Sequence, residues 1–169
     1  MAKNFLEQLL AEWYELNGYF IRKNVLVGKR AQGGYDCELD LVAFHPEKKH
    51  LVHIEASMDA SSWKERERRF KKKFDAGRKH IPHLFTGLDI PTYIDQVAVL
   101  VFASKQKRDK LSGGKLIIGS ELFKEIFKDL GSRPMYSQAI PEQFPILRAF
   151  QFVAQYRKEI YSILKEIKV

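Results

Sequence analysis

Polar and apolar positions alternate along two neighbouring segments of the chain in the way that β-strands require. Residues 36–44 and 50–57 carry polar and apolar side chains in turn, and a polar turn at residues 45–49 separates them. Successive side chains of a strand point to opposite faces of the sheet. The pattern therefore predicts an antiparallel hairpin in which acidic residues gather on one face.

Apolar residues recur every three or four positions in four other segments, a spacing typical of amphipathic helices. Ser62 and Glu65 have the spacing of a capping box and mark where the second helix begins. The last segment predicts one long amphipathic helix. The four helices are expected at residues 4–17, 63–81, 120–130 and 146–167.

Three more strands complete the predicted sheet, at residues 19–27, 96–103 and 115–118. The second of these is almost continuously apolar, which indicates a central strand buried on both faces. The order of elements predicts an α/β fold with a mixed central sheet of about five strands and helices on both faces. A chain of 169 residues fits one domain over residues 1–169.

Composition narrows the class of protein. The chain is 45% hydrophobic and 12% aromatic, which indicates a folded protein. Cys37 is the single cysteine, so we expect no internal disulfide, no cysteine-based zinc site and a cytoplasmic location. No segment approaches the roughly 18 apolar residues that a membrane span needs. We also find no P-loop and no dinucleotide fingerprint, so no nucleotide cofactor is expected.

Positive charge is concentrated in one predicted helix. The net charge is +8, and residues 64–80 hold nine Lys or Arg against three acids. A basic stripe on one helix is typical of proteins that bind polyanions such as DNA. A basic, glycine-containing loop at residues 28–34 could approach a phosphate backbone or simply form a hairpin turn. The candidate nucleic-acid contacts are Lys29, Arg30, Arg68, Arg69, Lys71, Lys72 and Lys73.

The acidic face of the hairpin suggests a metal. Alternation places Asp36, Glu38 and Asp40 on one face of the first strand, and Glu55 and Ser57 on one face of the second. If Asp40 and Glu55 converge, a like-charge contact at about 4 Å costs roughly 4 kcal/mol at an effective dielectric of about 20. A hard divalent cation removes that cost, so Mg2+ or Mn2+ is the expected cofactor.

These segments resemble the core of the PD-(D/E)XK nuclease superfamily, which includes restriction endonucleases, Mrr-like enzymes and Holliday-junction resolvases. The stretch Leu39-Asp40-Leu41-Val42-Ala43 is similar to the first family motif, and Ile54-Glu55-Ala56-Ser57 stands where the second is expected. The resemblance covers about residues 4–81, with helices from about residue 120 to 169 completing the domain. It implies a restriction-endonuclease-like three-layer sandwich. It also implies metal-dependent hydrolysis of DNA phosphodiester bonds, in restriction, defence or DNA repair.

The resemblance also implies roles for individual residues. Asp40 and Glu55 would hold the metal, with the backbone carbonyl of Ala56 as a third ligand. A glutamate on the first helix supports the metal in the junction resolvases, and both Glu7 and Glu12 fit that position. Two further candidates remain open. Glu38 is a second ligand or an ion-pair partner, and His53 is a general base, a phosphate contact or a structural residue.

One departure from the family pattern bears on catalysis. Ser57 occupies the position of the usual catalytic lysine, and it cannot supply a positive charge. Lys64 and Arg66, early in the next helix, are the candidate substitutes. Without a substitute the alternative is a catalytically impaired nucleic-acid-binding module or an accessory subunit. For an enzyme that cuts both strands, the simplest assembly is a two-fold homodimer.

Overall fold

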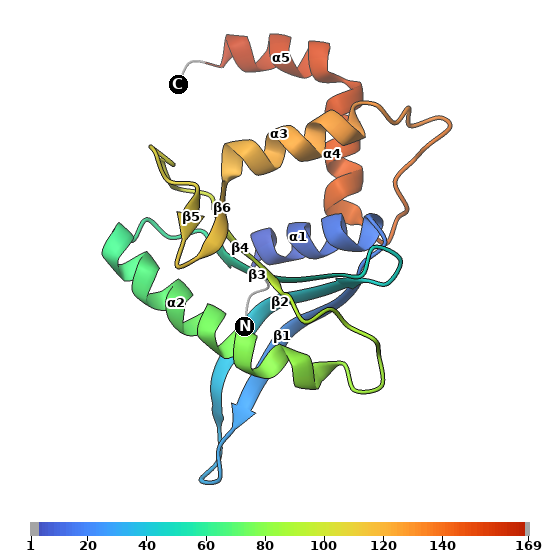
Figure 1. The fold of residues 1–169 in the computed structure, drawn as a ribbon. Helices are drawn as coiled ribbons and strands as arrows, with labels where there is room; N and C mark the ends of the chain where they lie inside the picture. Colours follow the sequence, from blue (N-terminus) through green and yellow to red (C-terminus); the bar gives the residue numbers. More distant parts are fainter. Residues whose placement is uncertain (1–3, 168–169) are drawn as a thin grey trace. The chain divides into compact units, whose positions relative to one another are not determined.

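The structure is a computed structural model, and it describes residues 4–167. The chain forms two compact units, one ending at Ser120 and the other beginning at Glu121. The first unit contains the sheet and all the predicted acidic residues, and the second is helical (Figure 1). This division does not test whether the two units form one domain, so the single domain expected over residues 1–169 stays a prediction.

The elements follow the predicted order, with three differences at short or terminal segments. The first unit contains α1 (Phe5–Leu16), β1 (Phe20–Lys29), β2 (Tyr35–His45), β3 (His50–Ser57), α2 (Trp63–His80), the short 3-10 helix η1 (Ile81–Leu84), β4 (Asp95–Leu100), β5 (Lys110–Leu111) and β6 (Gly114–Ile118). From there the chain continues through α3 (Gly119–Leu130), α4 (Pro145–Gln155) and α5 (Arg157–Glu166).

The six strands form one mixed, open sheet in the order β1-β2-β3-β4-β6-β5. β1, β2 and β3 are antiparallel neighbours, whereas β3, β4 and β6 run parallel. The sixth strand, which the sequence did not predict, is β5. It has two residues, too few to show any periodicity.

Helices α1 and α2 cover opposite faces of the sheet (Figure 1). Neighbouring residues of β1 establish this, because they point to opposite faces. Lys23 donates a hydrogen bond to Gln8 on α1 at 3.0 Å. Arg22 donates to the carbonyl of Leu84, just beyond α2, at 3.0 Å. The face under α2 carries the acidic residues, as the next subsection describes.

The apolar face of α2 forms a core with the centre of the sheet. Phe70 and Phe74 pack with Ala98, Leu100 and Leu116. The helix begins as predicted, because the side chain of its N-cap residue, Ser62, accepts a hydrogen bond from the amide of Glu65 at 3.3 Å. The amphipathic spacing predicted for this helix is confirmed, because Phe70, Phe74 and Gly77 are buried.

The second unit corrects one prediction. The long helix expected over residues 146–167 is two helices, α4 and α5, which break at Tyr156. Nothing in the sequence marks the break, because neither glycine nor proline occurs there. The apolar side chains of α5 are largely exposed, with Leu164 at 59%. No helix within residues 4–167 is long and apolar enough to cross a membrane.

Candidate functional site

The register of β2 and β3 brings Asp40 and Glu55 together. Leu41 pairs with Ile54, so the next positions along the two strands are Asp40 and Glu55. The Asp40 amide donates to Glu55 Oε1 at 3.2 Å, and the Ala56 amide donates to Asp40 Oδ2 at 2.9 Å. Both residues are buried, at 8% and 1% exposure. The predicted convergence of the two carboxylates is confirmed.

The cation between these carboxylates is Lys73 of α2. Its Nζ forms an ion pair with Asp40 Oδ1 and another with Glu55 Oε2. Each carboxylate therefore gives one oxygen to backbone donors of the hairpin and directs the other toward a shared point. An ammonium at that point compensates two charges that burial would otherwise make costly.

Burial is the largest cause of the raised pKa of both carboxylates in this triad. Burial, followed by the charge of Glu55, raises the pKa of Asp40 to about 6, although Lys73 opposes the shift. Burial also raises the pKa of Glu55. Burial alone would lower the pKa of Lys73, but the two carboxylates together raise it. Lys73 is therefore a permanent cation at neutral pH.

Ser57 belongs to a second ion-pair network next to the triad. Its Oγ donates to Asp59 Oδ2 at 2.6 Å and accepts from Arg69 Nη2 at 3.3 Å. Arg69 Nη1 also pairs with Asp59 Oδ2 at 2.6 Å. Burial would raise the pKa of Asp59, but the hydrogen bonds from Ser57 and its neighbours lower it. Arg69 lies one helical turn before Lys73, so α2 presents two cations to the polar face of β3.

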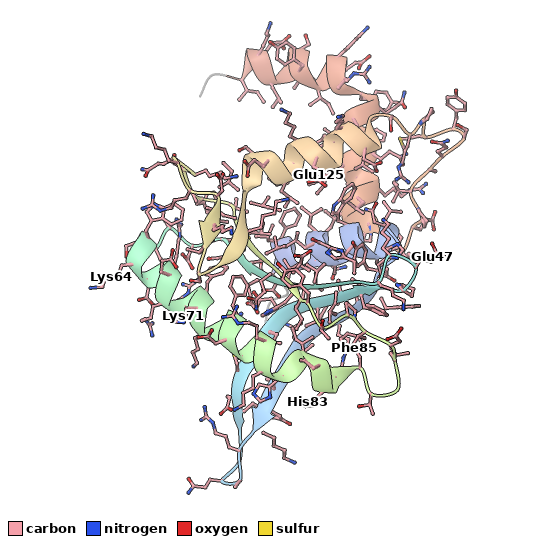
Figure 2. All side chains as sticks on the ribbon, viewed as in Figure 1. Glu47, Lys64, Lys71, His83, Phe85 and Glu125 are labelled. Carbon is pink, nitrogen blue, oxygen red and sulfur yellow. The ribbon has the colours of Figure 1, made fainter. Side chains whose placement is uncertain are left out.

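The two expected lysine substitutes lie elsewhere. Lys64 is exposed and points outward near the start of α2 (Figure 2). It stands about 13 Å from Lys73 along the helix axis, at about 1.5 Å per residue. Arg66 is 4% exposed and donates to the carbonyls of Asp59 and Phe102 at 2.8 and 2.9 Å, so it holds two loops together.

The predicted glutamates on the first helix are not brought to the triad. Glu7 and Glu12 belong to α1, which covers the opposite face of the sheet. Glu7 accepts a hydrogen bond from Asn4 at 3.0 Å, and Glu12 accepts one from Gln8 at 3.1 Å. Glu38 accepts a hydrogen bond from Asn24 at 3.2 Å.

The two convergent carboxylates belong to the class of oxygen ligands that Mg2+ takes. Within residues 4–167, no cluster of three or more His, Cys, Asp or Glu side chains is placed to hold a metal. Mg2+ nevertheless needs only one or two carboxylates, because it dehydrates reluctantly and retains water ligands. Asp40 and Glu55 satisfy that requirement with one oxygen each. Ala56, predicted as a third ligand through its backbone carbonyl, contacts Asp40 through its backbone amide, which donates to Asp40 Oδ2.

His53 is fully buried beneath α2, with its Nε2 2.7 Å from Glu55 Oε1. Burial, reinforced by the charge of Lys73, lowers the pKa of His53 to about 3. The imidazole is therefore neutral at physiological pH. Its ring packs edge-on against Phe74 with 5.4 Å between centroids.

Replacing Gly77 with alanine is expected to destabilise the protein by about 1–3 kcal/mol, the usual cost of overpacking. A Cβ at Gly77 would lie 2.2 Å from His53 Nδ1. The clash opposes the gain of about 1 kcal/mol that alanine brings to a helix. Urea unfolding measures the difference, with the exposed Lys72→Ala as the matched helix control. A Gly77→Ala protein as stable as wild type would contradict this packing.

The predicted DNA-binding residues divide into two groups. Arg69 and Lys73 turn toward the sheet, as described above. The others are exposed, although three have acidic neighbours: Arg30 pairs with Asp36, Arg68 with Glu65, and Lys71 with Asp75. The exposed members are Lys29, Arg30, Arg68, Lys71 and Lys72, and Figure 2 shows Lys71 on the outer side of α2.

Lys73 was predicted to contact DNA from the surface of α2. The structure instead places its ammonium between Asp40 and Glu55. The sequence does contain a sign that Lys73 faces the sheet. It lies three residues after Phe70 and four before Gly77, so it shares a helix face with these two buried residues. Gln96, which lies against His53, and Arg78, which donates to Gln96, were also missed. Gln96 is the second of two polar residues that begin β4, and the rest of that strand is apolar.

Comparisons with known proteins identify no family for this chain. No family model matches the sequence, and no curated protein matches it. The chain is similar to one crystal structure described as a protein of unknown function, AF1548. That similarity has 15% identity and a TM-score of 0.47, over 89% of this chain and 97% of the other. A likeness this distant carries no argument about function.

Proposed function

We propose that this protein is a metal-dependent endonuclease of the restriction-endonuclease-like fold, in which Lys73 supplies the cation absent at Ser57. The observation that carries the proposal is the contact of Lys73 Nζ with both Asp40 and Glu55. A lysine beside two convergent carboxylates is the set of catalytic groups that the resemblance to the PD-(D/E)XK superfamily implies. Here the lysine comes from the helix that follows the hairpin.

In this proposal Asp40 and Glu55 hold Mg2+ or Mn2+ through the oxygens that now face Lys73. The bound ion would stabilise charge on the phosphate and lower the pKa of a water. With an ion held there, Lys73 would give up its direct ion pairs, and its ammonium would donate to a phosphate oxygen instead. Its flexible side chain, 31% exposed, has the freedom to make that change. The backbone amides of Asp40 and Ala56 keep the two carboxylates oriented throughout.

Exposed basic residues support DNA as the substrate. Lys72 and Lys71 lie on the outer side of α2, and the β1–β2 hairpin carries Lys29 and Arg30 at its tip. Figure 1 shows this hairpin extending past the C-terminal part of α2. Lysine and arginine on such surfaces bind phosphates without reading the bases, so affinity should fall steeply with salt. A two-fold homodimer would place one such site on each strand.

A specific observation also favours the second candidate, a nucleic-acid-binding module that does not cut. Lys73 already compensates the charge of Asp40 and Glu55. A site neutralised by its own lysine is stable without a metal, so the fold does not require one. Such a module would bind DNA with the same salt dependence and show no turnover.

The deciding experiment is a plasmid-nicking assay with Mg2+, Mn2+ or EDTA, comparing wild type, Lys73→Ala and Lys124→Ala. Metal-dependent nicking by wild type is expected to fall about 100-fold in Lys73→Ala, the usual loss when one charge-stabilising donor is removed. Lys124 is an exposed helical lysine outside the proposed DNA-binding set, and Lys124→Ala is expected to cut within about twofold of wild type. DNA retained in a gel shift without any nicking by wild type would favour the binding module.

A further inference from the structure

A chain of buried hydrogen bonds leads from the surface of α2 to Glu55. Arg78 Nη1 donates to Gln96 Oε1. Gln96 Nε2 lies 2.8 Å from the carbonyl oxygen of Phe74 and 3.4 Å from His53 Nδ1. His53 Nε2 then lies 2.7 Å from Glu55 Oε1. None of these residues except Glu55 has a role in the proposed reaction so far.

The direction of every bond in this chain follows from two partners of Gln96 whose donor or acceptor role is fixed. A guanidinium can only donate, so the Gln96 atom that meets Arg78 is the amide oxygen. A backbone carbonyl can only accept, so the atom that meets Phe74 is the amide nitrogen. Two independent partners therefore fix the orientation of the Gln96 amide.

That orientation selects one tautomer of His53. The Gln96 Nε2 amide group is a donor, so His53 Nδ1 must be the acceptor. The proton of the neutral ring then lies on Nε2, which donates to Glu55 Oε1. The opposite tautomer would set two donors against each other at Nδ1 and leave a lone pair facing a carboxylate.

Glu55 is held rigidly as a result. Its Oε1 receives two hydrogen bonds, one from His53 and one from the amide of Asp40 at 3.2 Å. Its Oε2 remains for the shared point that Lys73 now occupies. Gly77 makes room for the imidazole, because any side chain at that position would strike the ring.

We propose that His53 is a positioning residue, held as its Nε2–H tautomer by Gln96 and Arg78, that aims Glu55 Oε2 at the reacting centre. The catalytic consequence rests on the nuclease function proposed above, whereas the tautomer does not. Outer partners that orient a ligating group typically change metal affinity or activity 10- to 100-fold when removed.

The first test is independent of catalysis. Nitrogen-15 NMR of the imidazole at neutral pH distinguishes the two neutral tautomers of His53. Wild type is expected to show the Nε2–H form alone, and Gln96→Leu is expected to show a mixture of both forms. An Nδ1–H form in wild type, or an unchanged spectrum in Gln96→Leu, would overturn the proposal.

The second test compares two substitutions of similar polarity. The amide nitrogen of glutamine reaches the position of His Nε2, whereas that of asparagine reaches only the position of Nδ1. His53→Gln can therefore still donate to Glu55, and His53→Asn cannot. We expect nicking and Mn2+ affinity to be at least about tenfold higher in His53→Gln than in His53→Asn. Equal losses in both variants would reduce His53 to a packing role.

The two proposals fail in different ways. Wild type that never nicks DNA, yet shows the Nε2–H tautomer and the difference in Mn2+ affinity, would remove the nuclease function and keep the positioning role. Wild type that nicks DNA with the wrong tautomer at His53 would do the reverse.

Discussion

Asp40→Ala and Glu55→Ala are each expected to lower Mg2+-dependent nicking by about 1,000-fold or more. Each variant removes one of the two carboxylate oxygens that converge on the position of Lys73 Nζ. A metal that polarises phosphate contributes several kcal/mol to the barrier. At about 1.4 kcal/mol per tenfold change in rate, a loss of about 4 kcal/mol corresponds to that factor. Nicking rates measured at a saturating metal concentration test the expectation.

Glu38→Ala is the matched control for these two variants. Glu38 lies on the same strand as Asp40, but its side chain bonds to Asn24 outside the triad. It should retain nicking within about threefold of wild type, since surface changes away from a site have small effects. Nicking that survives Asp40→Ala would mean that the activity does not come from this site.

The hairpin was predictable because its information is local. Alternation along β2 and β3 decides which side chains share a face, and the short turn between them decides the register. Asp40 and Glu55 could therefore be paired from the sequence alone. Their burial was not predicted, because alternation says which residues share a face and not what covers that face.

The partner of these carboxylates was not predictable in the same way. Lys73 lies 33 residues from Asp40 and 18 from Glu55, so the contact depends on how α2 crosses the sheet. A helical wheel places Lys73 beside the Phe70 and Phe74 stripe, but a lysine at that edge usually extends its charge into water. Lys73 turns inward because its ammonium is attracted to the two buried carboxylates beneath the helix.

The glutamates of the first helix show another limit of local reasoning. Helical spacing places Glu7 and Glu12 on α1 but does not say which face of the sheet α1 covers. The hydrogen bond from Lys23 to Gln8 answers that question, because it assigns α1 to the face away from the triad. The resemblance to the resolvases suggested these residues, and the packing of this chain separates them from Asp40.

Lys73→Met is expected to lower the free energy of unfolding by about 3–5 kcal/mol at pH 8 in EDTA. Removing one partner of a buried ion pair leaves an uncompensated charge, and that is its usual cost. Here two carboxylates remain, with side chains that are 11% and 1% exposed. Methionine keeps the volume of the side chain and removes only its charge. Urea unfolding in EDTA measures the loss, and the exposed Lys72→Met serves as the control.

The pH dependence of this loss identifies its cause. A carboxyl whose folded-state pKa is raised stabilises the protein below its unfolded pKa, and that contribution disappears as pH rises through the folded pKa. In wild type the pKa of Asp40 is already raised to about 6. Without Lys73 the pKa of Asp40 rises further. The stability difference between Lys73→Met and wild type should therefore shrink as pH falls from 8 toward 4. A difference independent of pH would point to lost packing instead of uncompensated charge.

Mg2+ should reverse the same loss at pH 8. An ion that binds only the folded state stabilises it by about 2.7 kcal/mol at 100 times its Kd. In Lys73→Met nothing competes for Asp40 Oδ1 and Glu55 Oε2, whereas in wild type the ion must displace an ammonium. The gain in unfolding free energy from Mg2+ should therefore be larger in Lys73→Met than in wild type or Lys72→Met. Equal gains in all three proteins would mean that the ion binds elsewhere and that these carboxylates serve Lys73 alone.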